Sequence, residues 1–94
     1  MLIEVAPGDK EWVGFKVEDL ETDEVISTAT WVAPAPLNVL STVKHDTEVS
    51  VLLSGFVLGA RYRVTCEIVT TRGGREINRY LDIVVVDMTG SELV

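Results

Sequence analysis

Three kinds of side chain in this 94-residue chain could do chemistry: a run of carboxylates, one histidine and one cysteine. The carboxylates are Asp19, Glu21, Asp23 and Glu24, and hard cations such as Ca²⁺ prefer oxygen ligands of this kind. An EF-hand loop, however, needs glycine at its sixth position and glutamate at its twelfth, where this chain has Glu24 and Thr30. We therefore expect a solvated acidic turn between strands, with no metal and no other cofactor.

The histidine and the cysteine each lack the partners that catalysis needs. His45 stands beside Asp46, but the sequence ties no nucleophile or oxyanion-stabilising group to it, so we expect a solvent-exposed loop histidine. Cys66 alternates in step with apolar residues, which predicts a buried and inert thiol. Because a glycine-rich phosphate loop, paired Cys/His spacing and a catalytic triad are all missing from the sequence, we predict that the protein is not an enzyme.

Charge is distributed unevenly along the chain. The net charge of −7 arises in residues 1–60, where ten acids face three lysines, and residues 61–94 balance five arginines against five acids. A negative chain repels phosphate backbones, so nucleic acid is not an expected partner. The arginines could instead bind an acidic protein surface, including that of another copy of this chain.

All five arginines belong to a predicted β-hairpin that runs from Gly59 to Val86. In its first strand apolar residues occupy every second position, which predicts one buried and one solvated face. These inward residues are Tyr62, Val64, Cys66 and Ile68. Gly73 and Gly74 can take the positive φ angles of a tight two-residue turn, so the chain should reverse there.

The second strand of the hairpin has apolar residues on both faces. Its buried face is continued by Leu81, Ile83 and Val85, and Tyr80, Val84 and Val86 point the other way. Either the N-terminal strand and loops cover this outer face, or it contacts another protein. We predict that the arginines and the outer face bind a partner, through Arg61, Arg63, Arg72, Arg75, Arg79, Tyr80, Val84 and Val86.

The remaining chain has the pattern of further short strands, at residues 2–5, 11–18, 25–33, 37–43 and 47–54. In the third of these, alternation puts Trp31 in the sandwich centre and Ile26 on the opposite face. Pro34 and Pro36 end that strand, and the chain should cross between sheets there. The sequence thus predicts an all-β, seven-stranded Greek-key sandwich of immunoglobulin-like (fibronectin type III-like) kind, with a small barrel as the alternative. We expect one domain over residues 1–94, with 87–94 as a flexible tail.

Composition limits where the protein works. The hydrophobic fraction of 47% is ordinary, and no apolar run approaches the ~20 residues of a membrane helix, so we expect a soluble protein without a membrane partner. The N-terminus does not have the pattern of a secretory signal. A single cysteine cannot form a disulfide within the chain, which suits folding in a reducing cytoplasm.

A longer pattern in the chain resembles a known family. It consists of Ile26, Trp31 and Pro34, then Ser54-Gly55, then Gly59-x-x-Tyr62-x-Val64-x-Cys66-x-Ile68, ending in Gly73-Gly74-Arg75. This pattern resembles small immunoglobulin-like proteins encoded among the virion genes of tailed bacteriophages and prophages, over residues 20–86. The resemblance implies that Tyr62 ties its strand to the preceding loop through its hydroxyl. The chain departs from the group at Phe15, where tryptophan is common, and in its acidic turn.

The resemblance implies a structural virion protein, assembled in the host cytoplasm and without catalytic residues. The first hypothesis is a capsid decoration or cement protein that binds the major capsid protein, or another virion protein, and its own copies as a homo-oligomer. The alternative is an immunoglobulin-like module of a tail, neck or fibre that recognises a host-surface glycan or protein. The loops favour the first, because they are acidic or built from Gly, Pro and Ala and lack the aromatic residues of recognition loops. A metal-dependent role of the acidic turn is the third hypothesis.

Overall fold

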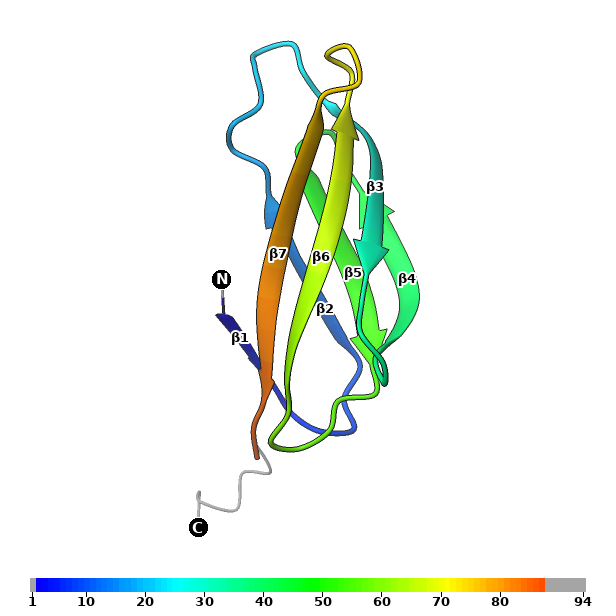
Figure 1. Ribbon diagram of the computed structural model, residues 1–94, viewed down its shortest axis with the longest axis vertical. Helices are drawn as coiled ribbons and strands as arrows, with labels where there is room; N and C mark the ends of the chain where they lie inside the picture. Colours follow the sequence, from blue (N-terminus) through cyan, green and yellow to red (C-terminus); the bar gives the residue numbers. More distant parts are fainter. Residues whose placement is uncertain (1, 88–94) are drawn as a thin grey trace.

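The computed structural model describes residues 2–87, which form two facing β-sheets (Figure 1). The strands are β1 (Leu2–Val5), β2 (Glu11–Lys16), β3 (Ile26–Val32), β4 (Asn38–Lys44), β5 (Glu48–Ser54), β6 (Arg61–Thr70) and β7 (Glu76–Val85). The described residues contain no helix long and apolar enough to cross a membrane. The predicted all-β class with seven strands in a sandwich is confirmed, and the immunoglobulin-like Greek-key assignment stays a prediction. The predicted flexible tail lies outside the described residues except for Asp87.

One sheet has four strands in the order β1-β7-β6-β3, and the other has three in the order β2-β5-β4. The chain changes sheet between β3 and β4, in the segment of Pro34 and Pro36, as the prolines predicted. The Ala35–Pro36 peptide bond is cis. At one edge of the four-stranded sheet β1 pairs parallel with β7, and residues 2–5 lie opposite residues 82–85. The N-terminal strand therefore extends the four-stranded sheet and does not cover its outer face.

The core lies between the sheets and follows the predicted alternation closely in β5, β6 and β7. The inward residues of these three strands are Val49, Val51, Leu53, Tyr62, Val64, Cys66, Ile68, Leu81, Ile83 and Val85, and all are buried. Trp31 is buried among them and meets the Phe15 ring edge-on, with the ring centres 5.8 Å apart. The Tyr62 hydroxyl forms no hydrogen bond within residues 2–87, so the corner bond implied by the resemblance is not formed there.

The prediction of strict alternation in the third strand was wrong. Ile26 and Trp31 were placed on opposite faces, but both are buried. Between Ile26 and Thr28 the register with β6 shifts, so Ser27 is an extra residue of a β-bulge. A bulge inserts one residue and resets which positions face inward. Ile26 and Trp31, five positions apart, can therefore both face the core from the same strand.

The hairpin turn forms where the glycine pair predicted it. Gly73 and Gly74 have φ angles of +65° and +78°, which residues with a side chain rarely adopt. The loop is longer than the two residues expected, because Thr70 N–H donates to the Arg75 carbonyl oxygen at 2.9 Å and residues 71–75 lie outside the strands. The longer loop has room for the side-chain contacts of Arg75 described below.

Candidate functional site

The structure separates the predicted partner-binding residues into four places. Arg61, Arg63, Tyr80 and Val84 all lie on the outer face of the four-stranded sheet, because the alternate residues of β6 and β7 are buried. Arg75 and Arg79 instead reach the acidic turn. Arg72 is exposed in the hairpin loop, and Val86 follows the end of β7, where its N–H donates to the Val5 carbonyl oxygen at 2.9 Å.

The centre of the outer face is a stacked pair of side chains. Tyr80 is 51% exposed, and the guanidinium carbon of Arg63 lies 3.9 Å from the centre of its ring. Arg63 also forms a bidentate pair with Asp82, in which Nε donates to Oδ1 at 2.9 Å and Nη2 donates to Oδ2 at 3.3 Å. The hydrogen bond raises the pKa of Arg63 and lowers that of Asp82, so both groups are held in their charged forms. Arg63 is thus fixed in place between an aromatic ring and a carboxylate.

Two exposed apolar residues that the sequence did not single out adjoin this pair. Val32 of β3 is opposite Thr65, which is in turn opposite Tyr80. On the other flank, Leu2 of β1 is opposite Asp82. Val32 is 53% exposed and Leu2 57%. We call this surface the Tyr80 face, and it comprises Leu2, Val32, Arg63, Tyr80 and Asp82.

The residues of the Tyr80 face come from four separate strands, which explains why the sequence did not reveal them together. Leu2 and Val32 reach the face only because β1 and β3 flank the hairpin formed by β6 and β7. Each of them is an ordinary strand residue in its own segment. The sequence signals were the apolar surplus on the outer side of the last strand, which indicated Tyr80, and the arginines of the hairpin, which include Arg63.

The acidic turn contains a buried carboxylate, contrary to the predicted solvated turn. Glu24 is only 3% exposed. Its side chain accepts hydrogen bonds from the Thr70 hydroxyl, from Glu21 N–H at 3.0 Å and from Arg75 Nη1 at 2.8 Å. These donors, with Thr70 first, hold the pKa of Glu24 below its ordinary value. Asp19 is exposed and pairs with Arg79 Nη2 at 2.6 Å.

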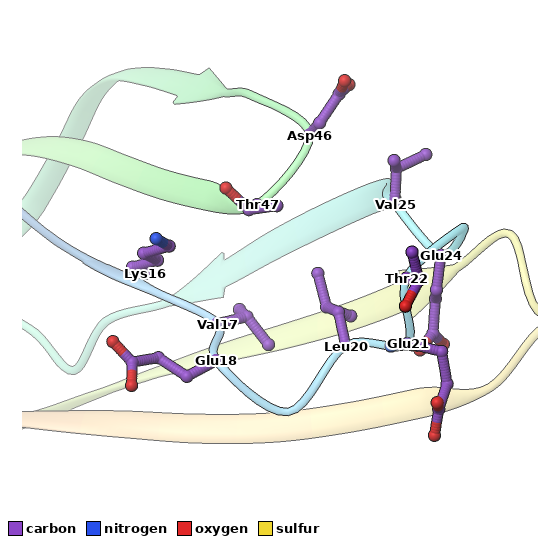
Figure 2. A pocket seen from close by; sticks show the side chains of 10 residues that line it. All are labelled: Lys16, Val17, Glu18, Leu20, Glu21, Thr22, Glu24, Val25, Asp46 and Thr47. Carbon is purple, nitrogen blue, oxygen red and sulfur yellow. Dashed lines mark hydrogen bonds between the residues drawn. The ribbon is translucent and has the colours of Figure 1, made fainter.

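A pocket of about 500 Å³ opens beside this turn, between residues 16–25 and the loop before β5 (Figure 2). Val17, Leu20 and Val25 supply its apolar lining, and Glu18 and Asp46 stand at its border. Figure 2 shows the Glu18 and Asp46 carboxylates turned away from each other. Within residues 2–87, no three histidine, cysteine or acidic side chains are grouped as metal ligands. Two of the four carboxylates of the turn are instead paired with arginines.

The other two candidates for chemistry lie where the sequence predicted. His45 is exposed in the loop between β4 and β5. Cys66 is fully buried in β6, and its removal from water raises the pKa of its thiol to about 12. A thiol with so high a pKa is almost entirely protonated at neutral pH and is a poor nucleophile.

Comparison with known proteins adds one finding to this geometry. A family model described as "Podophage GP4 fiber-tail adaptor protein gp77" matches residues 6–84. No curated protein matches the chain. The matched residues include β2 to β6 and most of β7. The match supports a phage virion protein, gives no support to capsid decoration, and is closer to the tail and fibre alternative.

Proposed function

Because the chain belongs to the podophage GP4 fiber-tail adaptor protein gp77 family and is a phage virion component, we propose that it joins a fibre protein to the tail. The role is structural and non-enzymatic, and its partners are other virion proteins. A surface whose side chains are already ordered binds a partner at a smaller entropic cost. The Tyr80 face supports this role because its central side chains are already fixed.

The composition of the Tyr80 face is that of a protein-binding surface. Tyrosine and arginine are enriched among the residues that dominate binding energies, and here they are stacked on each other. Arg63 is already oriented by Asp82 before any partner arrives, so less side-chain freedom is lost on binding than for an unpaired arginine. Leu2 and Val32 add apolar area on either side. This preformed Arg63–Tyr80 stack is the observation that carries the proposal.

Recognition of a host-surface glycan is the second candidate. It rests on Trp12, which is exposed on the outer face of the three-stranded sheet, in the same row as Leu52 and Ser41. An exposed indole is a suitable platform for a sugar ring, and the Ser41 hydroxyl lies on the same face on the far side of β5. The adaptor role is favoured because it agrees with the family description. Glycan binding that Trp12→Ala abolishes would support the second candidate.

The adaptor role is tested by co-purification with the tail and fibre proteins of the same phage. We expect the wild-type chain to capture both, and Tyr80→Asp combined with Val84→Asp to lose at least one. Arg63→Lys keeps the charge but loses the planar stack and the fork, so it should weaken the same contact about tenfold. Leu58→Asp is the control for adding a charge at an exposed apolar position, since Leu58 lies in the loop before β6 and is not a residue of the Tyr80 face.

Each result decides a different part of the proposal. A wild-type chain that captures neither tail nor fibre protein would reject the adaptor role. Capture that survives both Tyr80→Asp/Val84→Asp and Arg63→Lys would show that another surface is used. Thermal melting of every variant separates loss of binding from loss of fold.

A further inference from the structure

One long segment of the chain carries no charge. Residues 25–43 are nineteen consecutive residues without Asp, Glu, Lys, Arg or His, although charged residues make up 24% of the chain. Four of the large apolar side chains that the structure leaves exposed belong to it, namely Val32, Val39, Leu40 and Val43. Such a segment would ordinarily be part of a core, and here much of it is on the surface.

The uncharged segment forms one lateral side of the sandwich. It supplies β3 and β4, which are the edge strands of the two sheets and lie on the same side of the molecule (Figure 1). The opposite side, formed by the β1 and β2 edges and the acidic turn, carries Glu4, Glu11 and Glu18. We call the side formed by β3 and β4 the neutral side.

On the neutral side, β4 is exposed along its whole length. All seven of its residues are exposed. Val43 is opposite Ser50 and so lies on the outer face of its sheet. Val39 is opposite the fully buried Leu53 and so lies on the inner face, yet it is 44% exposed. The strand therefore stands at the rim of the sandwich, where the opposing sheet leaves its inner face uncovered.

The free edge of β4 has little protection against another strand. Exposed edges are usually guarded by charged side chains, which repel a second strand. The one charge on β4 is Lys44, and its ammonium group is held by a hydrogen bond to the Ile26 carbonyl oxygen at 3.2 Å. A bulge at Leu40 interrupts the ladder with β5, but Ser41–Lys44 pair in unbroken register. This stretch is available for backbone pairing on its free side.

We propose that the neutral side binds a second copy of this chain, with the two β4 strands pairing antiparallel across a twofold axis. Two copies with a charge of −7 each repel one another at most orientations, and the neutral side is where they meet without carboxylates in contact, since its one charge is Lys44. Identical strands that pair antiparallel about a twofold axis are self-complementary, because each offers the same donors and acceptors to the other. The inference is independent of the adaptor role.

The test is sedimentation equilibrium of the purified full chain, wild type and variants. We expect a dimer whose affinity rises with added salt, because salt screens the net repulsion and breaks no charge pair at a neutral contact. Val43→Glu and Val43→Lys should each weaken dimerisation at least about tenfold, since a twofold axis brings either charge against its own copy. Leu58→Glu, in a loop at the end of the sandwich, should leave the dimer unchanged.

Comparing a positive with a negative charge at Val43 distinguishes pairing with a second copy from binding to an acidic partner. If Val43→Lys tightens association while Val43→Glu weakens it, the surface that meets β4 is acidic, and pairing with the same strand of a second copy is wrong. A wild-type chain that stays monomeric up to its solubility limit also overturns the proposal. Circular dichroism of each variant checks that the sheet is intact, and Leu40→Lys at the neighbouring exposed position provides a second variant.

Discussion

Arg75 Nη1 lies 2.8 Å from Oε1 of Glu24, and the Glu24 side chain is fully buried while that of Arg75 is 37% exposed. The contact joins the β6–β7 hairpin loop to the acidic turn before β3. Arg75 also donates to the Asp19 carbonyl oxygen at 3.3 Å, so one guanidinium holds both ends of the turn. The turn is thus fixed to the end of the four-stranded sheet by a residue that the sequence suggested for partner binding.

Replacing the buried carboxylate should destabilise the fold. Glu24→Ala removes the acceptor of the Thr70 hydroxyl, of Glu21 N–H and of Arg75, and buried donors left unpaired are costly. We expect the melting temperature to fall by several degrees, whereas Glu21→Ala at the exposed neighbouring position should change it little. A double-mutant cycle with Arg75→Ala should show coupling between the two residues. Additive effects would mean that the ion pair contributes nothing to stability.

Stability should also decline in acid. The pKa of Glu24 is lower in the folded than in the unfolded chain, chiefly through its hydrogen bond from Thr70, and that of Asp82 is lowered by Arg63. A lowered pKa stabilises the fold above the ordinary carboxyl pKa of about 4, and this contribution is lost as pH falls through the folded-state value. Urea midpoints between neutral pH and about pH 3 measure the loss.

Glu24→Gln provides the matched control for the pH dependence. The amide cannot ionise, so the variant should be less stable at neutral pH and should lose less of its stability on acidification. Asp82→Asn should have a smaller effect, because its pair with Arg63 is solvent-exposed and screened. Parallel pH profiles for wild type and Glu24→Gln would contradict the assignment.

Local rules predicted the parts of the fold that depend on neighbours in sequence. The alternation around Cys66 predicted a buried strand face, and Gly73-Gly74 predicted the turn, because strand period and positive φ are properties of a few adjacent residues. The inward position of Ile26 was missed because a bulge depends on how β3 meets β6. Burial of Glu24 was missed because its partners Thr70 and Arg75 are 46 and 51 residues away.

The candidate site was predicted only in part, for a related reason. The apolar surplus of the last strand identified Tyr80, and the count of arginines identified Arg63, but not that the two are stacked. The sequence offered no reason to treat the five arginines differently, and it missed that Arg63, Arg75 and Arg79 are each paired with a carboxylate of the chain. Which cation is free for a partner depends on distant carboxylates, and a local pattern does not contain that information.

The thiol of Cys66 should react with a labelling reagent only when the chain unfolds. It is fully buried and its pKa is raised to about 12. In the folded chain a reagent therefore cannot reach the sulfur, and almost none of the thiol is in the reactive thiolate form. We expect no reaction with a thiol reagent such as DTNB at neutral pH in native buffer, and one equivalent in denaturant. Glu24→Ala should speed the reaction in native buffer by raising the unfolded population. Rapid labelling of the folded wild-type chain would show that β6 is accessible.

The backbone of β5 lies so near Gly14 of β2 that this position should not tolerate a side chain. Gly14 is opposite Ser50 in the ladder, and a Cβ at Gly14 would overlap the Val49 carbonyl oxygen and lie 2.9 Å from Ser50 Cα. Both are backbone atoms, which cannot rotate away. We expect Gly14→Ala to lower the free energy of unfolding by about 1–3 kcal/mol, the usual cost of overpacking, measured by urea denaturation.

Ser50 distinguishes a backbone clash from a side-chain clash at this position. The Ser50 hydroxyl would lie 2.7 Å from the same Cβ, and Ser50→Gly removes it while leaving the Val49 oxygen in place. Gly14→Ala should therefore lower the free energy of unfolding as much in the Ser50→Gly background as it does in the wild-type chain. Full rescue would show that only the hydroxyl was in the way. The backbone geometry instead makes Gly14 a requirement of the close pairing between β2 and β5, which positions Val13 and Val51 in the core.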